Sequence, residues 1–115
     1  MTVIVYGIPN CDTVKKARSW LDQHGVAFTF HDYKKQGVDA ERIAGWVEQA
    51  GWEQVLNRRG TTFRALPDAD KVDIDAAKAV SIMAANSSCI KRPIVEHAGE
   101  LLVGFNADAW SKAFG

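Results

Sequence analysis

The sequence predicts an α/β fold in which a mixed β-sheet is interrupted by a helical insertion. Two observations predict this class: strand-like β-branched runs occur near both ends of the chain, and amphipathic patterns of helical period fill the middle. The 115 residues, 47% of them hydrophobic, are enough to bury one core. We expect one domain over residues 1–115, with a sheet core formed by residues 1–34 and 87–115 and a helical insertion over residues 35–86.

The first third of the chain is expected to form a β-α-β unit. Residues 3–6 are a β-branched and aromatic run bounded by a Gly-Ile-Pro-Asn turn, which is typical of a buried strand. Residues 14–21 then place apolar side chains at helical spacing, and Gly25 stands where a glycine cap belongs. Residues 27–33 alternate and predict a second strand. The two strands should run parallel with a right-handed crossover.

The middle of the chain is expected to be helical and rich in turns. Residues 38–50 keep apolar side chains on one helical face, and Gly51 ends the pattern. A long turn-rich segment follows. Either Asp73 or Asp75 can then cap another helix, whose apolar face lies within residues 76–83.

The end of the chain predicts two further strands and a helix. Residues 93–97 and 101–104 form a strand–turn–strand pattern, most simply an antiparallel hairpin. Asn106 can cap a final helix with Ala109 and Trp110 facing inward. The complete order is β-α-β, then helices, then β-β-α. This is a thioredoxin-like order with a helical insertion between its halves.

Composition and charge exclude several classes of function. Fourteen Lys and Arg balance fourteen Asp and Glu, so we expect neither nucleic acid nor a membrane as a partner. Two cysteines are too few for a disulfide scaffold, and the three histidines show no metal-ligand spacing, so no metal site is expected. The N-terminal residues lack the pattern of a signal peptide, which predicts a cytoplasmic protein.

Cys11 is the residue that most strongly indicates chemistry. It opens the first predicted helix, where unpaired backbone N–H groups and the helix dipole stabilise a thiolate. Lys15 and Lys16 stand in the first turn, where cations oppose the dipole but assist a bound anion. The alternative interpretation is that Cys11 is a small buried hydrophobic residue and that the lysines form a solvated face.

Cys11 has no local partner thiol, because Val14 occupies the position that would complete a C-x-x-C motif. It must therefore react with an external thiol or with Cys89. The simplest interpretation of Cys89 is a packed thiol at the entrance to a strand.

Arginines provide two further candidate positions. Arg92 precedes Pro93 at the start of a predicted strand, and an X-Pro bond is the one that can readily be cis. An arginine held there can face an anion or a thiolate. The alternative interpretation is a proline of an edge strand with an arginine on the surface. Arg58 and Arg59 form the second position, in a turn that is also typical of a solvated loop.

Taken together, these features resemble the arsenate reductase–Spx family, and within it the YffB-like branch. The resemblance spans nearly the whole chain in order, and the combination of segments is specific although each segment alone is not. The matching segments are residues 6–17, 31–33, 56–62, 90–94 and 102–105.

The resemblance implies a thioredoxin-like fold and a nucleophilic cysteine at Cys11. In arsenate reductases of the glutaredoxin-linked type, the cysteine attacks arsenate and three arginines hold the oxyanion. Arg59 and Arg92 are similar to two of these arginines, and the third is missing near residues 104–105. That family's histidine four residues before the cysteine is also absent, and a valine replaces its small hydroxyl residue three positions after it.

These features predict a glutathione-dependent thiol–disulfide reductase with one nucleophilic cysteine. We expect no bound cofactor, glutathione as a co-substrate and glutaredoxin as a candidate partner. Two alternatives from other classes are arsenate reduction and a non-catalytic, Spx-like regulator that binds a protein partner. We expect Cys11 to be the catalytic residue and the Arg92–Pro93 bond to be cis and to face it. The expected substrate- and glutathione-binding residues are Asn10, Thr13, Lys15, Arg59, Arg92 and Pro93.

Overall fold

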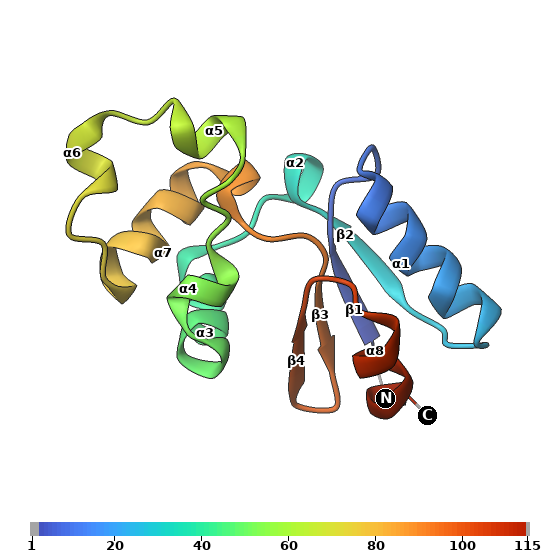
Figure 1. Ribbon diagram of the computed structural model, residues 1–115. Helices are drawn as coiled ribbons and strands as arrows, with labels where there is room; N and C mark the ends of the chain where they lie inside the picture. The colour runs from blue at the N-terminus through green and yellow to red at the C-terminus, as the bar shows by residue number, and fades with distance from the viewer. Residues whose placement is uncertain (1–2, 115) are drawn as a thin grey trace. The chain divides into compact units, whose positions relative to one another are not determined.

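The computed structural model of the protein describes residues 3–114, which divide into two compact units (Figure 1). Residues 3–36 and 92–114 form the first, which we call the sheet unit. Residues 37–91 form the second, the helical unit. The expected sheet core over 87–115 therefore begins too early, since residues 87–91 belong to the helical unit.

The sheet unit is built on a four-stranded sheet with the strand order β2-β1-β3-β4. β1 (Val3–Gly7) pairs in parallel with β2 (Thr29–Asp32). β3 (Ile94–His97) pairs antiparallel with β1 and with β4 (Glu100–Val103). The α/β class, the parallel opening strands and the antiparallel hairpin are thus confirmed, and both halves of the predicted element order are present.

Two helices of the sheet unit pack on one face of the sheet. α1 (Asp12–Gln23) connects β1 to β2, and α8 (Ala107–Phe114) follows β4. Asn106 caps α8 as predicted, because its side-chain oxygen accepts the backbone N–H of Ala109 at 3.0 Å. Ala109 is exposed, so its predicted inward position is wrong. Trp110 is the residue of that turn that is buried in the core. One buried cluster of this unit contains Val3, Val5, Ala17, Leu21, Val95 and Trp110.

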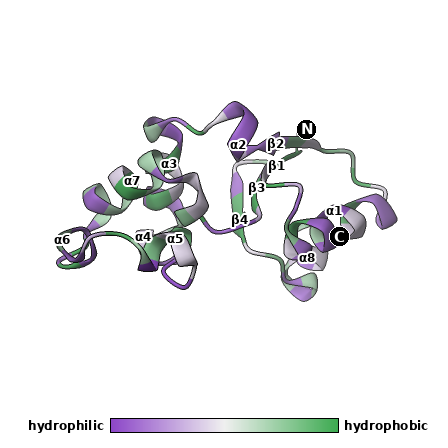
Figure 2. Ribbon diagram, turned by 90° about the horizontal axis from the view of Figure 1, so that it is seen from above, coloured by the Kyte–Doolittle hydropathy of each residue, from purple (hydrophilic) through white to green (hydrophobic). Residues whose placement is uncertain are grey.

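The helical unit contains two amphipathic helices that pack on each other, α3 (Ala40–Ala50) and α7 (Ala76–Ala85). Each begins at an aspartate whose side chain accepts the N–H three residues further on, Asp39 for α3 and Asp75 for α7, both at 2.8 Å. Of the two caps that the sequence left open for α7, the structure therefore uses Asp75 rather than Asp73. Figure 2 shows hydrophilic and hydrophobic residues interspersed along both helices.

Single helical turns fill the segment that the sequence predicts as rich in turns. They are α4 (Trp52–Val55), α5 (Thr61–Arg64) and α6 (Asp68–Lys71), and the 3-10 turn η1 (Ser87–Cys89) follows α7. Within the described part of the chain, no helix combines the length and the apolar character needed to cross a membrane.

A short antiparallel bridge joins residues 55–57 to residues 89–91 in the helical unit. The Asn57 N–H donates across it at 2.7 Å, and the Lys91 N–H donates back at 2.8 Å. These bonds tie residues 89–91 to the helical unit, and residues 87–89 also contact α7. The sequence predicts the strand at 93–97, but its local pattern cannot reveal a bridge between distant residues.

Gly7, at the end of β1, lies against the first turn of α1. A Cβ atom added to Gly7 would stand 2.8 Å from Val14 Cγ2, closer than packed carbon atoms approach. Both residues are buried. The isopropyl group of Val14 thus occupies the space that a side chain at position 7 would need. The missing histidine and the missing hydroxyl residue noted in the sequence correspond to one packing contact.

We predict that Gly7→Ala lowers the free energy of unfolding by about 1–3 kcal/mol, because the added methyl group overpacks against Val14. Val14→Ala opens the space again, so the double variant should be more stable than the sum of the two single effects implies. Urea unfolding of the wild type, both single variants and the double variant measures this coupling. Strictly additive effects would show that the two positions do not share one space.

Candidate functional site

Cys11 is the N-cap residue of α1. Its backbone is extended, with φ −124° and ψ 125°. Its carbonyl oxygen accepts the Lys15 N–H at 2.9 Å, which is the first hydrogen bond of the helix. The Cys11 side chain makes no capping hydrogen bond and is half-buried. The thiol therefore lies at the positive end of a 12-residue helix, where the first N–H groups have no helical partner.

The start of β3 lies at the same edge of the sheet as the end of β1. Tyr6 pairs with Ile94 across the two antiparallel strands. Pro93, one residue before Ile94, is therefore level with Gly7, from which the chain turns towards Cys11. The register of one strand pair thus brings two of the predicted site segments to one sheet edge.

The Arg92–Pro93 peptide bond is cis, as predicted. Pro93 is buried, and its carbonyl oxygen accepts the Gly104 N–H at 2.8 Å. Arg92 is half-buried. That this bond faces Cys11 stays a prediction.

Tyr33 is a buried neighbour of Arg92 that the sequence analysis did not single out. It begins the one-turn helix α2 (Tyr33–Gln36). Burial raises the pKa of the Tyr33 phenol well above its usual value, and the positive charge of Arg92 opposes this shift. The Tyr33 ring stacks on Tyr6 at 6.4 Å, and the Tyr6 hydroxyl donates to Glu96 Oε1 at 2.8 Å. The only sequence signal for this cluster is the His-Asp-Tyr segment that contributes to the family resemblance.

Cys89 is more deeply buried than Cys11. It is fully buried within the helical unit. Burial raises the pKa of its thiol, because the charged thiolate loses hydration there. The interpretation of Cys89 as a packed thiol is therefore confirmed.

Arg59 lines a pocket of about 280 Å³ in the helical unit, which we call the charged pocket. Arg58 and Lys91 line the same pocket, although neither is among the predicted binding residues. The backbone bridge between residues 55–57 and 89–91 brings Lys91 next to the segment that contains Leu56 and Asn57. No local pattern could have revealed this grouping. The lining residues are Glu53, Leu56, Asn57, Arg58, Arg59 and Lys91.

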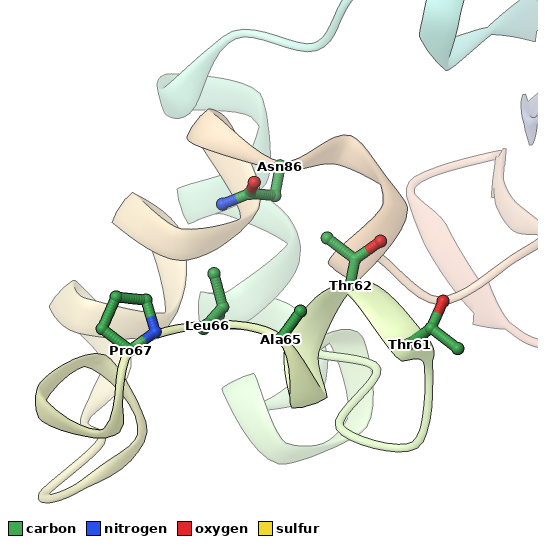
Figure 3. Close-up of a pocket in the computed structure, with 6 residues that line it drawn as sticks. All are labelled: Thr61, Thr62, Ala65, Leu66, Pro67 and Asn86. Atoms are coloured by element: carbon green, nitrogen blue, oxygen red, sulfur yellow. The ribbon is translucent and has the colours of Figure 1, made fainter.

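A second pocket of the helical unit, of about 500 Å³, has no titratable side chain in its lining (Figure 3). Its residues come from α5, from the segment after it and from the end of α7. The lining contains no acid or base that could activate the hydroxyl groups of Thr61 and Thr62. Its lining residues are Thr61, Thr62, Ala65, Leu66, Pro67 and Asn86.

The predicted site residues are distributed over both units. Among residues 3–114, no group of three or more His, Cys, Asp or Glu side chains is placed to hold a metal ion. The exposed residues Asn10, Thr13 and Lys15 lie in the sheet unit with Cys11, Arg92 and Pro93, whereas Arg59 lies in the helical unit.

Comparison with known proteins places these residues in a family context. Residues 6–113 match the model of the ArsC family. The solved structure of the YFFB protein is 53% identical, with a TM-score of 0.96 over 98% of this chain and 99% of that one. An arsenate reductase (ArsC) related protein from Brucella melitensis is 51% identical, with a TM-score of 0.77 over 99% of this chain and 95% of that one.

A curated relative carries a different description. The global transcriptional regulator Spx of Streptococcus mutans is 28% identical over 92% of this chain and 78% of its own length. The resemblance to the arsenate reductase–Spx family and to its YffB-like branch is thus confirmed. The family match includes the Cys11 turn, the Arg59 turn and the Arg92–Pro93 segment, and it covers both units. The chain belongs to the ArsC family.

Proposed function

We propose that the protein is a glutathione-dependent thiol–disulfide reductase that uses Cys11 as its single nucleophile. The position of Cys11 supports this most directly: a half-buried thiol without a capping hydrogen bond begins α1, at the edge where Pro93 leads into β3. Cys89 is fully buried, and Val14 replaces the second cysteine of a C-x-x-C motif. An external thiol, glutathione, is therefore the proposed resolving group.

The proposed reaction consists of two thiol–disulfide exchanges. The Cys11 thiolate attacks the glutathione sulfur of a mixed disulfide R–S–S–G, so that Cys11–S–S–G forms while R–S⁻ leaves and takes up a proton. A glutathione thiolate then attacks the Cys11-bound glutathione sulfur, which releases oxidised glutathione and restores the Cys11 thiolate. The R–S group leaves with the electron pair of the bond that breaks, and the incoming glutathione thiolate supplies the pair for the new S–S bond, so one glutathione thiol is oxidised for each R–SH released. No bound redox cofactor is required.

Glutathione is an anionic peptide with two carboxylates, and the expected binding residues suit that chemistry. We assign Arg92 and Arg59 to its carboxylates, because guanidinium groups form charge-assisted hydrogen bonds with them. Asn10 and Thr13 supply polar groups around the thiol, and the exposed Lys15 adds a positive charge to the first turn. Glutaredoxin is the proposed protein partner, acting on the same mixed disulfide at Cys11.

Arsenate reduction is the competing function, because the Brucella melitensis relative is described as arsenate reductase related. The region of the missing third arginine argues against it. Gly104 has φ +76°, and its N–H donates a hydrogen bond to the Pro93 carbonyl oxygen. Phe105 packs edge-on against Trp110 with ring centroids 4.9 Å apart. One position thus has a backbone conformation that favours glycine and the other packs into the core, so neither supplies a cation.

A substitution of Cys11 tests whether this residue is the nucleophile. Cys11→Ser should abolish the glutathione-dependent reduction of a small glutathione mixed disulfide, because a serine hydroxyl cannot form the intermediate disulfide. Cys89→Ala, the matched control, should keep most of the activity, since Cys89 is buried. Oxidation of NADPH coupled to glutathione reductase measures the rate. Absence of activity in the folded wild type would favour the Spx-like regulator, and unchanged activity in Cys11→Ser would refute the assignment.

A further prediction concerns the rate of arsenate-dependent turnover. With glutathione and glutaredoxin present, we expect little or no arsenate-dependent turnover. The loss of one arginine from a buried oxyanion site costs on the order of 2–5 kcal/mol, or roughly thirtyfold to several thousandfold in rate. The measurement compares turnover with arsenate and with a glutathione mixed disulfide in the same preparation. Efficient arsenate turnover would overturn the substrate assignment while leaving Cys11 as the nucleophile.

A further inference from the structure

The charged pocket of the helical unit is held by backbone hydrogen bonds rather than by flexible side chains alone. The bridge that joins residues 55–57 to residues 89–91 fixes both of its walls. The Asn57 side-chain oxygen accepts the Arg59 N–H at 3.1 Å, which orders the turn between α4 and α5. Leu56 is 1% exposed and supplies an apolar floor. The pocket therefore has a defined shape to which charged groups are attached.

The charges of this pocket have both signs. Arg58, Arg59 and Lys91 carry positive charge, and Glu53 carries a negative one. The Arg58 guanidinium lies over the Trp52 ring, 5.4 Å from its centroid, which orients it. Across the part of the chain that the structure describes, neither Glu53 nor Arg59 takes part in an ion pair. Glu53 and Arg59, which line one pocket with opposite charges and form no ion pair among the described residues, can each bind a group of a zwitterionic ligand.

The size and the charges of the pocket point to one chemical group. Its volume of about 280 Å³ lies just below the usual range of ligand pockets, about 300–1,000 Å³, and suits a fragment better than a whole tripeptide. A free α-amino acid head carries a carboxylate and an ammonium group on the same carbon. The γ-glutamyl residue of glutathione has such a head, because its peptide bond is formed through the side chain.

We propose that the charged pocket binds the α-amino acid head of the γ-glutamyl residue of glutathione, with the carboxylate held by Arg58, Arg59 and Lys91 and the ammonium group held by Glu53. The identity of the ligand rests on the proposed function. The pocket adds to it Arg58, Lys91 and Glu53, to which the family resemblance assigns no role. Glu53 is the specificity-determining residue, because it distinguishes an amino acid head from a simple anion.

Removing the negative charge of Glu53 tests this proposal, because the proposal and its alternative predict opposite changes in affinity. The probe is S-methylglutathione, which cannot exchange disulfides, and its binding to the full chain is measured by isothermal titration. Glu53→Gln should weaken binding about fivefold, because the ammonium group loses its partner. A pocket that accepts only negative groups would instead bind more tightly once the Glu53 charge is removed. Tighter or unchanged binding by Glu53→Gln would overturn the proposal.

N-acetylation of the probe removes the positive charge from the ligand instead of from the protein. N-acetyl-S-methylglutathione should bind the wild type about fivefold more weakly than S-methylglutathione does. The Glu53→Gln variant should bind the two probes with equal affinity, because the partner of the ammonium group is already absent. Arg58→Gln should weaken binding of both probes. An equal loss on N-acetylation in the wild type and in Glu53→Gln would show that Glu53 does not contact the ammonium group.

The matched controls are Arg64→Gln and Glu41→Gln, exposed residues of the same unit that do not line the pocket. Both should bind S-methylglutathione like the wild type, and losses equal to those of the pocket variants would refute the site. Turnover of a glutathione mixed disulfide is measured in parallel. If the wild type turns over but the pocket variants bind normally, this proposal fails while the proposed function stands. If Cys11 proves inactive, specific binding by the pocket would still support the site.

Discussion

The antiparallel pairing of β1 with β3 is the constraint on which the candidate site depends. Because Tyr6 pairs with Ile94, Pro93 stands level with Gly7 at one edge of the sheet. The chain leaves β1 at that edge and begins α1 at Cys11. Gly7 lets the first turn of α1 approach closely, since its missing side chain leaves room for Val14. One strand register and one glycine therefore bring Cys11 and the Arg92–Pro93 segment to the same end of the sheet unit.

The parts of the fold that were predictable are those encoded over short distances. The cap at Asn106, the cap at Asp75 and the alternation in the strands all act within a few residues, and the structure contains each of them. The one-turn helices between residues 52 and 71 were not predicted, because a single turn is too short to show a helical period. Ala109 was misplaced because alanine fits either face of a helix, and the larger Trp110 decides which face is buried.

The candidate site also combines features encoded over short distances with features that depend on contacts between distant residues. Cys11 at a helix start and the X-Pro bond at Pro93 are local patterns, so sequence reasoning found them. The charged pocket depends on a bridge between residues distant in the chain, so the contribution of Lys91 became apparent only in the structure. The departures from the arsenate reductase pattern also gain a physical meaning. The absent histidine and hydroxyl residue correspond to one packed contact, and the absent third arginine corresponds to a glycine turn beside a core aromatic ring.

The proposed function requires the half-buried Cys11 thiol to form a mixed disulfide with glutathione. The most direct measurement exposes the folded full-length protein to oxidised glutathione, digests it under acidic conditions and locates the glutathionyl group by mass spectrometry. We expect a glutathionyl group on Cys11, removed by an excess of reduced glutathione, and an unmodified Cys89. A glutathionyl group on Cys89 with Cys11 unmodified would contradict it, as would a Cys11 that remains a free thiol throughout.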